Sequence, residues 1–359
     1  MAGFLPVSEW RLFPEGNGLF VIAGPCSAES RQQVLSAAEA VKPFAGVFRA
    51  GLWKPRTHPG GFEGVGEEGL EWLLEARSRT GLKICTEVGS AAHVRACISA
   101  GVDLIWIGAR TTSNPFQVQE IADALAGTNI PIFVKNPASP DLDLWSGAIE
   151  RLAAAVGTRP EDKGASRIAA VLRGFKTLDR SVYRNTPVWE MAARLQARFP
   201  GLTVFADPSH MAGDSNLVAE LAQRALDLGI EGLMLEVHPK PEEALSDSSQ
   251  QLSPEGFAGL MKSLHTRSGA GSAAQRELEE LRSKIDSIDS RLLSLLAERM
   301  EVSSQIGLVK SHHQISILQA GRWDALLTSL KTQASALGLD SAMVERLFNI
   351  IHEYSIKKQ

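Results

Sequence analysis

Ionisable side chains follow eight short apolar segments of the chain, each at or just beyond the point where the segment ends. In chain order they are Cys26, Arg49 with Lys54, Glu87, Arg110, Lys135, Arg173, Asp207 with His210, and Glu236 with His238. Five of these residues are lysine or arginine. So much positive charge in one pocket would need a bound anion to neutralise it. We therefore expect a small ligand with several negative charges, and phosphate suits arginine because the two pair bidentately.

A second set of side chains has the composition of a metal site. Cys26, His210, Glu236 and Asp247 offer a thiolate, an imidazole and two carboxylates. This mixed set suits Mn²⁺, Fe²⁺, Co²⁺ or Zn²⁺ better than Mg²⁺, which prefers oxygen ligands and keeps several waters. A lone cysteine is also commonly a small buried hydrophobic residue. Spacing alone leaves both interpretations of Cys26 open.

The eight apolar segments alternate with longer amphipathic stretches, the pattern of βα units and a parallel sheet. The segments cover residues 19–26, 46–51, 83–88, 104–110, 131–136, 168–174, 203–209 and 232–238. Eight strands are the number that a (β/α)₈ TIM barrel requires, and its active site lies where the strands end. The alternative is a doubly wound open sheet, but no segment carries the glycine-rich turn common in such folds.

The pattern changes after the last strand. Residues 265–275 are small and polar and predict a linker between an α/β barrel domain, residues 1–264, and an all-α domain, residues 276–359. Apolar residues then recur at helical spacing, which indicates one long helix packed on a partner. They are Leu278, Leu281, Ile285, Ile288, Leu292, Leu295, Val302, Ile306 and Val309. Two further helices follow, the last with Asp340 or Ser341 as its N-cap. We expect this three-helix domain to form a homodimer.

Composition excludes several classes of protein. The 359 residues carry a formal net charge of −4 and no basic stripe, which argues against a nucleic-acid partner. The N-terminus has no signal-peptide pattern and no segment is long and apolar enough to span a membrane. Three cysteines are an odd number in a long chain and predict a reduced, cytoplasmic protein.

Seven motifs, spread over residues 19–262, resemble those of the 3-deoxy-D-arabino-heptulosonate 7-phosphate (DAHP) synthases. In order they are AGPCS, KPRT, TEV, GARTT, VKN, ADPSH and LEVHPKPEEALSD. They are most similar to the compact bacterial subgroup shared with the 3-deoxy-D-manno-octulosonate 8-phosphate synthases. The resemblance implies condensation of phosphoenolpyruvate with erythrose 4-phosphate, which releases phosphate at the entrance to aromatic amino-acid synthesis.

The resemblance also implies roles for the residues at the strand ends. Cys26, His210, Glu236 and Asp247 match the metal ligands of the family, for one divalent ion that we expect to be Mn²⁺ before Co²⁺, Fe²⁺ or Zn²⁺. The residues that match the phosphoenolpyruvate site are Arg49, Lys54, Arg110, Lys135 and Arg173. Glu87 is our candidate for positioning the water that adds during the reaction. Lys54, Glu87 and His210 are therefore the predicted catalytic residues of the barrel.

The loop at Lys54, Pro55, Arg56 and Thr57 matches the family segment that grips erythrose 4-phosphate. Pro55 fixes a backbone angle and would present Arg56 and Thr57 rather than leave them mobile. The octulosonate synthases typically carry Lys-Ala-Asn-Arg here and take arabinose 5-phosphate, which is the alternative substrate. A rigid surface loop with incidental charge is the simpler interpretation.

Arg299 interrupts the apolar stripe of the long helix where an apolar residue is expected. A charge on a buried face needs a partner. Lys310, about three turns on, shares that face and is positive as well, so it is not that partner. A structural ion pair would explain Arg299 as well as a binding site would. Residues 275–359 resemble the all-helical chorismate mutases, which implies an intertwined dimer with two arginine-lined sites. The matching residues are Arg282 (from the partner helix), Arg299, Lys310, Arg322, Ser355 and Gln359.

Rearrangement of chorismate to prephenate needs no covalent step, so the site has only to hold the reactive conformer and stabilise charge. Arg282 and Arg299 suit the two carboxylates, and Lys310 and Gln359 suit the breaking ether oxygen. The family's acids at the substrate's hydroxyl end are replaced here by Gln319 and Trp323. We therefore expect a mutase domain that also mediates feedback inhibition by prephenate. The alternative is a catalytically weak sensor and dimerisation module.

Overall fold

The computed structural model describes residues 3–13, 19–54, 60–177, 181–266, 272–317 and 320–358. The chain divides into two compact units, Met1–Arg267 and Ser268–Gln359. This division falls inside the segment expected to be a linker, and the first helix of the second unit begins at Ser272. Each unit is described by itself below.

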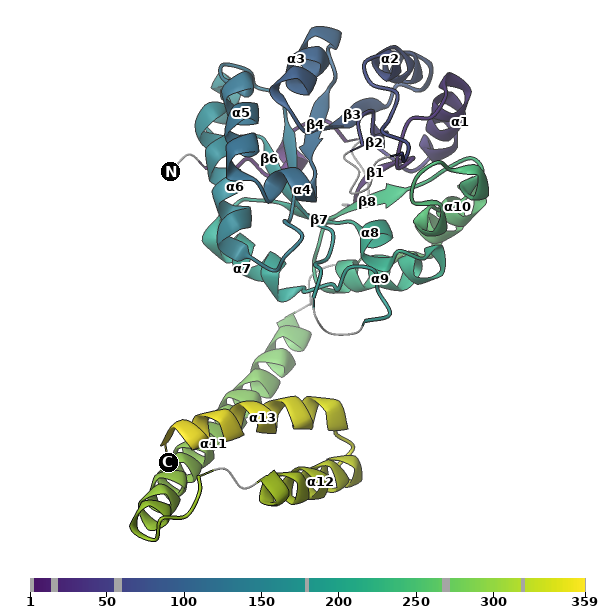
Figure 1. Cartoon of the computed structure of the whole chain (residues 1–359). Helices are drawn as coiled ribbons and strands as arrows, with labels where there is room; N and C mark the ends of the chain where they lie inside the picture. Colours follow the sequence, from purple (N-terminus) through teal and green to yellow (C-terminus); the bar gives the residue numbers. More distant parts are fainter. Residues whose placement is uncertain are drawn as a thin grey trace. The chain divides into compact units, whose positions relative to one another are not determined.

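The first unit is a closed barrel of eight parallel strands ringed by helices (Figure 1). Its strands are β1 Phe20–Gly24, β2 Val47–Arg49, β3 Lys83–Val88, β4 Leu104–Ile107, β5 Ile132–Lys135, β6 Ile168–Leu172, β7 Val204–Ala206 and β8 Gly232–Glu236. Each strand pairs with its neighbours in sequence, and β1 pairs with β8 to close the ring. The eight predicted strands and the (β/α)₈ class are therefore confirmed, and the open sheet is excluded.

Helices follow the strands and bury their apolar faces against the outside of the barrel. They are α1 Arg31–Val41, α2 Glu68–Thr80, α3 Ala91–Ala100, α4 Ala109–Thr112, α5 Pro115–Leu125, α6 Leu142–Ala155, α7 Glu190–Arg198, α8 Pro208–Ala212, α9 Val218–Asp227 and α10 Pro254–Ser263. Short 3₁₀ turns are η1 Val7–Glu9, η2 Pro160–Asp162, η3 Ser215–Leu217, η4 Pro241–Glu243 and η5 Ser248–Gln250.

Apolar side chains fill the inside of the barrel. Trp10, which follows η1, is fully buried and packs edge-on against Phe133 of β5, with ring centroids 5.5 Å apart. Ile22, Val47, Cys85, Leu104, Trp106, Phe205 and Met234 belong to the same cluster. This filled interior leaves the carboxyl ends of the strands as the place where polar side chains gather.

The second unit consists of three helices, as the sequence predicted: α11 Ser272–His312, α12 Ala320–Ala336 and α13 Ser341–Lys358. α13 packs against both other helices. The side chain of Asp340 accepts a hydrogen bond from the backbone N–H of Met343 at 2.6 Å, so Asp340 is the N-cap of α13. Within the described part of the chain, no helix combines the length and the apolar character that crossing a bilayer requires.

Candidate functional site

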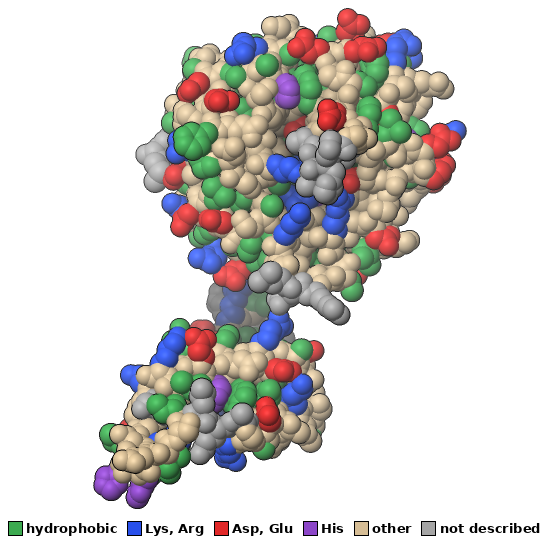
Figure 2. Space-filling model, in the orientation of Figure 1, with side chains coloured by type: hydrophobic (Ala, Val, Ile, Leu, Met, Phe, Trp, Pro, Cys, Tyr) green, Lys and Arg blue, Asp and Glu red, His purple; other side chains and the backbone are tan. Residues whose placement is uncertain are grey.

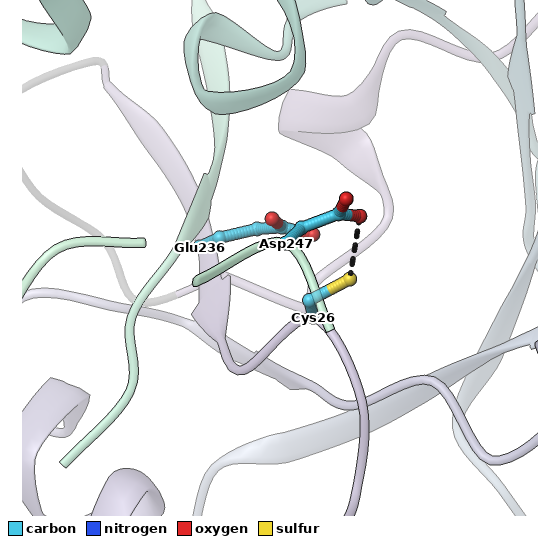
Figure 3. Close-up of side chains that lie close together, drawn as sticks. All are labelled: Cys26, Glu236 and Asp247. Carbon is cyan, nitrogen blue, oxygen red and sulfur yellow. Dashed lines mark hydrogen bonds between the residues drawn. The ribbon is translucent and has the colours of Figure 1, made fainter. Parts of the chain in front are cut away.

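Three of the four predicted metal ligands lie together at the carboxyl ends of the strands (Figure 3). Cys26 follows β1, Glu236 ends β8, and Asp247 belongs to the segment after β8. Their ligand atoms all lie within 4.8 Å of one another. The Cys26 thiol donates a hydrogen bond to Oδ2 of Asp247 at 3.3 Å. The structure thus assembles one sulfur and two carboxylates from opposite ends of the barrel sequence.

The donor set is suited to a divalent cation. Oε1 of Glu236 is fully buried and accepts no well-aligned hydrogen bond from a described residue, although it lies 3.1 Å from Arg49. Burial and, to a smaller extent, the charge of Glu236 raise the pKa of the Cys26 thiol to about 12. A bound cation would reverse this shift, because metal-bound thiols ionise. Asp247 has a left-handed backbone, φ +48°, a strained conformation that often marks a functional position.

His210, the fourth predicted ligand, lies at the edge of this group. Its Nε2 is 3.6 Å from Oε1 of Glu236, and its Nδ1 is 2.8 Å from Oδ2 of Asp207. Asp207 also caps α8 by accepting a hydrogen bond from the backbone N–H of His210. Burial lowers the pKa of His210, which favours the neutral imidazole that metals bind. The carboxylate on one ring nitrogen leaves the other facing Glu236, as in carboxylate–histidine–metal arrangements.

Three cations lie beside the metal group, two of them buried and one, Lys54, half-buried. Arg49 lies 4.7 Å above the ring of Trp106, and its Nε and one Nη have no hydrogen-bond acceptor among the described residues. Nζ of Lys54 donates to the sulfur of Cys26 at 3.1 Å. Nζ of Lys135, at the end of β5, lies 2.8 Å from Asp207. A substrate carboxylate or phosphate could accept the free donors of Arg49.

A pocket of about 240 Å³ opens beside these cations. Its lining includes Glu87, Arg110, Lys135, Arg173, Lys176, Arg184, Asn185, His210 and Asp247. Figure 2 shows lysine and arginine side chains gathered at the middle of this face of the barrel. Burial lowers the pKa of Arg173, and the neighbouring Arg184 and Arg110 add to that effect, which Asp207 partly offsets. The pocket therefore holds a surplus of positive charge, as an anionic substrate requires.

Glu87 is the second-last residue of β3, at the mouth of the barrel. Its Oε2 accepts a hydrogen bond from the indole N–H of Trp106 at 3.0 Å. A Cβ at Gly108 would come within 2.1 Å of Oε1 of Glu87, so only glycine leaves room for this carboxylate. The structure thus fixes Glu87 in the wall of the pocket, where it could act on water or substrate.

Two residues of the site carried no sequence pattern that pointed to them. Arg184 donates to Oδ1 of Asp247 at 2.8 Å and to Oε1 of Gln250 at 2.7 Å. Gln250 in turn donates to Oε2 of Glu236 at 2.7 Å. Arg184 lies in a loop and Gln250 ends the 3₁₀ turn η5, so the rule of strand ends that located the other residues could not find them. They form an outer layer that orients the two carboxylates.

Several predicted site residues lie outside the described residues. These are Pro55, Arg56 and Thr57 in the barrel, and Gln319 and Gln359 in the helical unit. Of the loop expected to grip erythrose 4-phosphate, only Lys54 is described, and it contacts Cys26.

The helical unit brings two of its predicted site residues into contact. Arg299 on α11 donates a hydrogen bond to the hydroxyl of Ser355 on α13. Nζ of Lys310 donates to the carbonyl of Ile317 at 2.7 Å. Arg282 and Arg322 are exposed and make no hydrogen bond or ion pair with a described residue of their own chain. Arg299 therefore has a hydroxyl partner rather than the ion pair that would make it purely structural.

Each of the two units matches a family of known proteins. Residues 12–268 match the model of the DAHP synthetase I family. The chain belongs to that family. Its synthase domain is 32% identical over 251 residues to the phospho-2-dehydro-3-deoxyheptonate aldolase of Thermotoga maritima, covering 69% of this chain and 70% of the relative. The 2-dehydro-3-deoxyphosphooctonate aldolase of Bradyrhizobium diazoefficiens is 30% identical, with 69% and 90% covered.

Solved structures agree with the sequence matches. The crystal structure of the Thermotoga maritima DAHP synthase covers 69% of this chain and 68% of its own, with a TM-score of 0.60 and 31% identity. Residues 281–359 match the model of chorismate mutase type II. The chain is accordingly a bifunctional enzyme, with a DAHP synthase domain followed by a chorismate mutase domain.

Proposed function

We propose that the synthase domain condenses phosphoenolpyruvate with erythrose 4-phosphate with the help of one divalent metal ion. The observation that carries this proposal is the compact group of Cys26, Glu236 and Asp247 beside a pocket rich in cations. With His210 these residues would hold the ion, Mn²⁺ before Co²⁺, Fe²⁺ or Zn²⁺. A bound ion would polarise the aldehyde of the sugar phosphate as a Lewis acid.

The residues of the chain have separate tasks in this proposal. Arg49 and Lys135, buried beside the metal group, bind the carboxylate of phosphoenolpyruvate, and Arg110 and Arg173 bind its phosphate. Held in this way, the enol carbon faces the aldehyde at reacting distance. Glu87 positions the water that adds before phosphate leaves.

Two sugar phosphates are candidates for the second substrate. Relatives of both kinds match this chain, a heptonate aldolase and an octonate aldolase. The sequence Lys54-Pro55-Arg56-Thr57 favours the four-carbon sugar, erythrose 4-phosphate. Arabinose 5-phosphate is the alternative substrate.

The test is a condensation assay on metal-stripped protein. Phosphate release from phosphoenolpyruvate is measured with erythrose 4-phosphate or arabinose 5-phosphate, before and after Mn²⁺, Co²⁺, Fe²⁺ or Zn²⁺ is restored. We expect no release without metal, recovery on metal addition, and at least tenfold preference for erythrose 4-phosphate. Full activity after chelation, with no metal by elemental analysis, would refute the metal role. Preference for arabinose 5-phosphate would reverse the substrate assignment.

We further propose that the mutase domain converts chorismate to prephenate and that prephenate inhibits the synthase domain. The contact of Arg299 with Ser355 supports a site for an anionic ligand among the three helices. Loss of the family's acids at Gln319 and Trp323 favours the alternative, a weak mutase that serves as a sensor. Chorismate consumption, followed by synthase assays with added prephenate, separates the two. We expect both turnover and inhibition; inhibition without turnover would leave only the sensor.

We also propose that the mutase domain forms a homodimer and that the enzyme works in the cytoplasm. The apolar stripe of α11 supports the dimer, because it remains exposed in the single chain. Its exposed members include Leu281, Ile285, Ile288, Leu292 and Leu295. Three cysteines without a disulfide support a reducing compartment.

A further inference from the structure

Two aromatic side chains of the mutase domain lie face to face beside the predicted chorismate site. The indole of Trp323 on α12 stacks on the imidazole of His352 on α13, with centroids 3.8 Å apart and planes inclined by 7°. His352 precedes Ser355 by three residues, so the two share one side of α13. Ser355 is the residue that accepts the hydrogen bond from Arg299. The stacked pair therefore adjoins the cation of the site.

The imidazole of His352 is available to a ligand. Neither ring nitrogen has a hydrogen-bond partner among the side chains and backbone that the structure describes. Partial burial and the nearby charges of Arg299 and Lys310 lower the pKa of His352, which favours the neutral ring. A neutral imidazole offers one donor and one acceptor. Stacking against Trp323 fixes the plane of the ring, in which the donor and the acceptor point.

The chemistry of chorismate indicates what this group would bind. The substrate carries two carboxylates, an ether oxygen and one ring hydroxyl, and its anionic groups pair with cations such as Arg299 and Lys310. The hydroxyl both donates and accepts a hydrogen bond, as a neutral imidazole does. Ser355 cannot supply both a donor and an acceptor to the substrate, because its hydroxyl already donates to the carbonyl of Ile351 and accepts from Arg299. His352, by contrast, keeps both a donor and an acceptor without a partner among the described residues.

We propose that His352 binds the ring hydroxyl of chorismate and that Trp323 positions the imidazole for this contact. The inference rests on the proposed chorismate site. It accounts for a feature of the sequence: Trp323 stands where the resembling mutases carry an acid at the hydroxyl end. The tryptophan replaces that acid, and the imidazole that it holds takes over the hydrogen bond.

The test compares chorismate with an analogue in which hydrogen replaces the ring hydroxyl. For His352→Ala we expect kcat/KM to fall about tenfold on chorismate, the effect of one lost hydrogen bond, and to change little on the analogue. His352→Gln keeps a donor and an acceptor and should recover part of the loss. An equal loss on both compounds would show that His352 only packs, and would overturn the inference.

Trp323 is tested as a positioning residue with the same two compounds. Trp323→Phe keeps an aromatic partner and should behave like the wild type. Trp323→Ala should lose the preference for chorismate over the analogue, as His352→Ala does. His313→Ala, at an exposed histidine just beyond α11, is the matched control and should change neither rate.

The outcomes also separate this inference from the proposed function. If the wild type binds chorismate without turnover, dissociation constants by calorimetry replace kcat/KM in the same comparison. If it neither binds nor converts chorismate, the proposed site fails and the assignment of His352 falls with it. An active wild type whose variants show no dependence on the hydroxyl leaves the mutase site standing and refutes His352 alone.

Discussion

The barrel buries the charged side chains of its candidate site, whereas the helical unit exposes a stripe of apolar side chains. In the barrel, Glu236 and Arg49 are at most 1% exposed and lie 3.1 Å apart, so the charges are buried and paired within one chain. In the helical unit, Ile285 and Leu295 are 56% and 59% exposed although both are strongly apolar. The barrel site is assembled by its own fold, whereas the helical unit leaves an apolar surface that another surface can cover.

This difference has an energetic basis. Burying one leucine or isoleucine side chain contributes about 1.5–3 kcal/mol, so a stripe of such residues represents a large part of the stability of a small domain. The buried ion pairs of the barrel work differently, since removing one partner leaves an uncompensated charge that costs about 3–5 kcal/mol. We therefore expect substitutions in the barrel site to act within one chain, and substitutions on the stripe to act through association.

The largest effect should follow Cys26→Ala. The thiol lies 3.3 Å from Asp247 and is the only sulfur in the candidate metal group, so its loss would remove one of the proposed ligands outright. Even changes to residues that merely orient ligands cost about 10–100-fold in metal affinity or activity. We expect DAHP synthesis to fall at least about 100-fold, with bound metal lost by elemental analysis and chorismate turnover unchanged.

Cys97→Ala is the matched control for this variant. Cys97 is also a buried thiol, but it lies in α3, away from the metal group. Its substitution should leave metal content and both activities within about twofold of the wild type. If Cys26→Ala retains its metal and its rate, Cys26 is the small buried hydrophobic residue that the sequence also allowed.

The sequence was sufficient to predict the barrel because its strands are buried on both faces and read as unbroken apolar runs. The same runs located Glu236 and Arg49, since side chains at the ends of barrel strands converge on one mouth. Arg184 and Gln250 were not predicted, because contacts between a loop and a short 3₁₀ turn leave no periodic pattern in the sequence. His352 was not predicted as a site residue for another reason: the sequence does not indicate which neighbour a histidine on an amphipathic helix will stack on.

A smaller effect, and one that depends on protein concentration, should follow Ile285→Asp on the stripe of α11. A carboxylate there would be desolvated in a dimer interface and would favour the monomer. We expect a concentration-dependent loss of chorismate turnover, about tenfold at micromolar protein, if Arg282 completes the site of the partner. Sedimentation measures the monomer, and DAHP synthesis should persist because the barrel contacts described above lie within one chain.

Leu337→Asp provides the comparison for Ile285→Asp. Leu337 is another exposed leucine of the helical unit, but it follows the end of α12 and does not belong to the stripe. This variant should remain associated and active. A monomeric wild type, or an Ile285→Asp protein that stays dimeric, would contradict the proposal that the stripe forms the interface.

The smallest effect should come from two matched helix caps, one in each unit. Asp340 accepts a hydrogen bond from the N–H of Met343 at the start of α13, and Asp141 accepts one from the N–H of Leu144 at the start of α6. Replacing either aspartate by alanine should cost about 1 kcal/mol, the usual contribution of an N-cap. Scanning calorimetry of the full chain should show a separate transition for each unit.

The same loss should lower the two transitions by different amounts. A cost of about 1 kcal/mol shifts Tm by about 4–8 °C in a domain of 60–100 residues but by about 2–4 °C in one of 150–250 residues, because the larger domain has the larger unfolding entropy. Asp340→Ala should therefore lower only the transition of the helical unit, and by the larger amount. If both variants lowered one common transition equally, the two units would unfold together, and the contrast between a self-sufficient barrel and a partner-dependent helical unit would not hold.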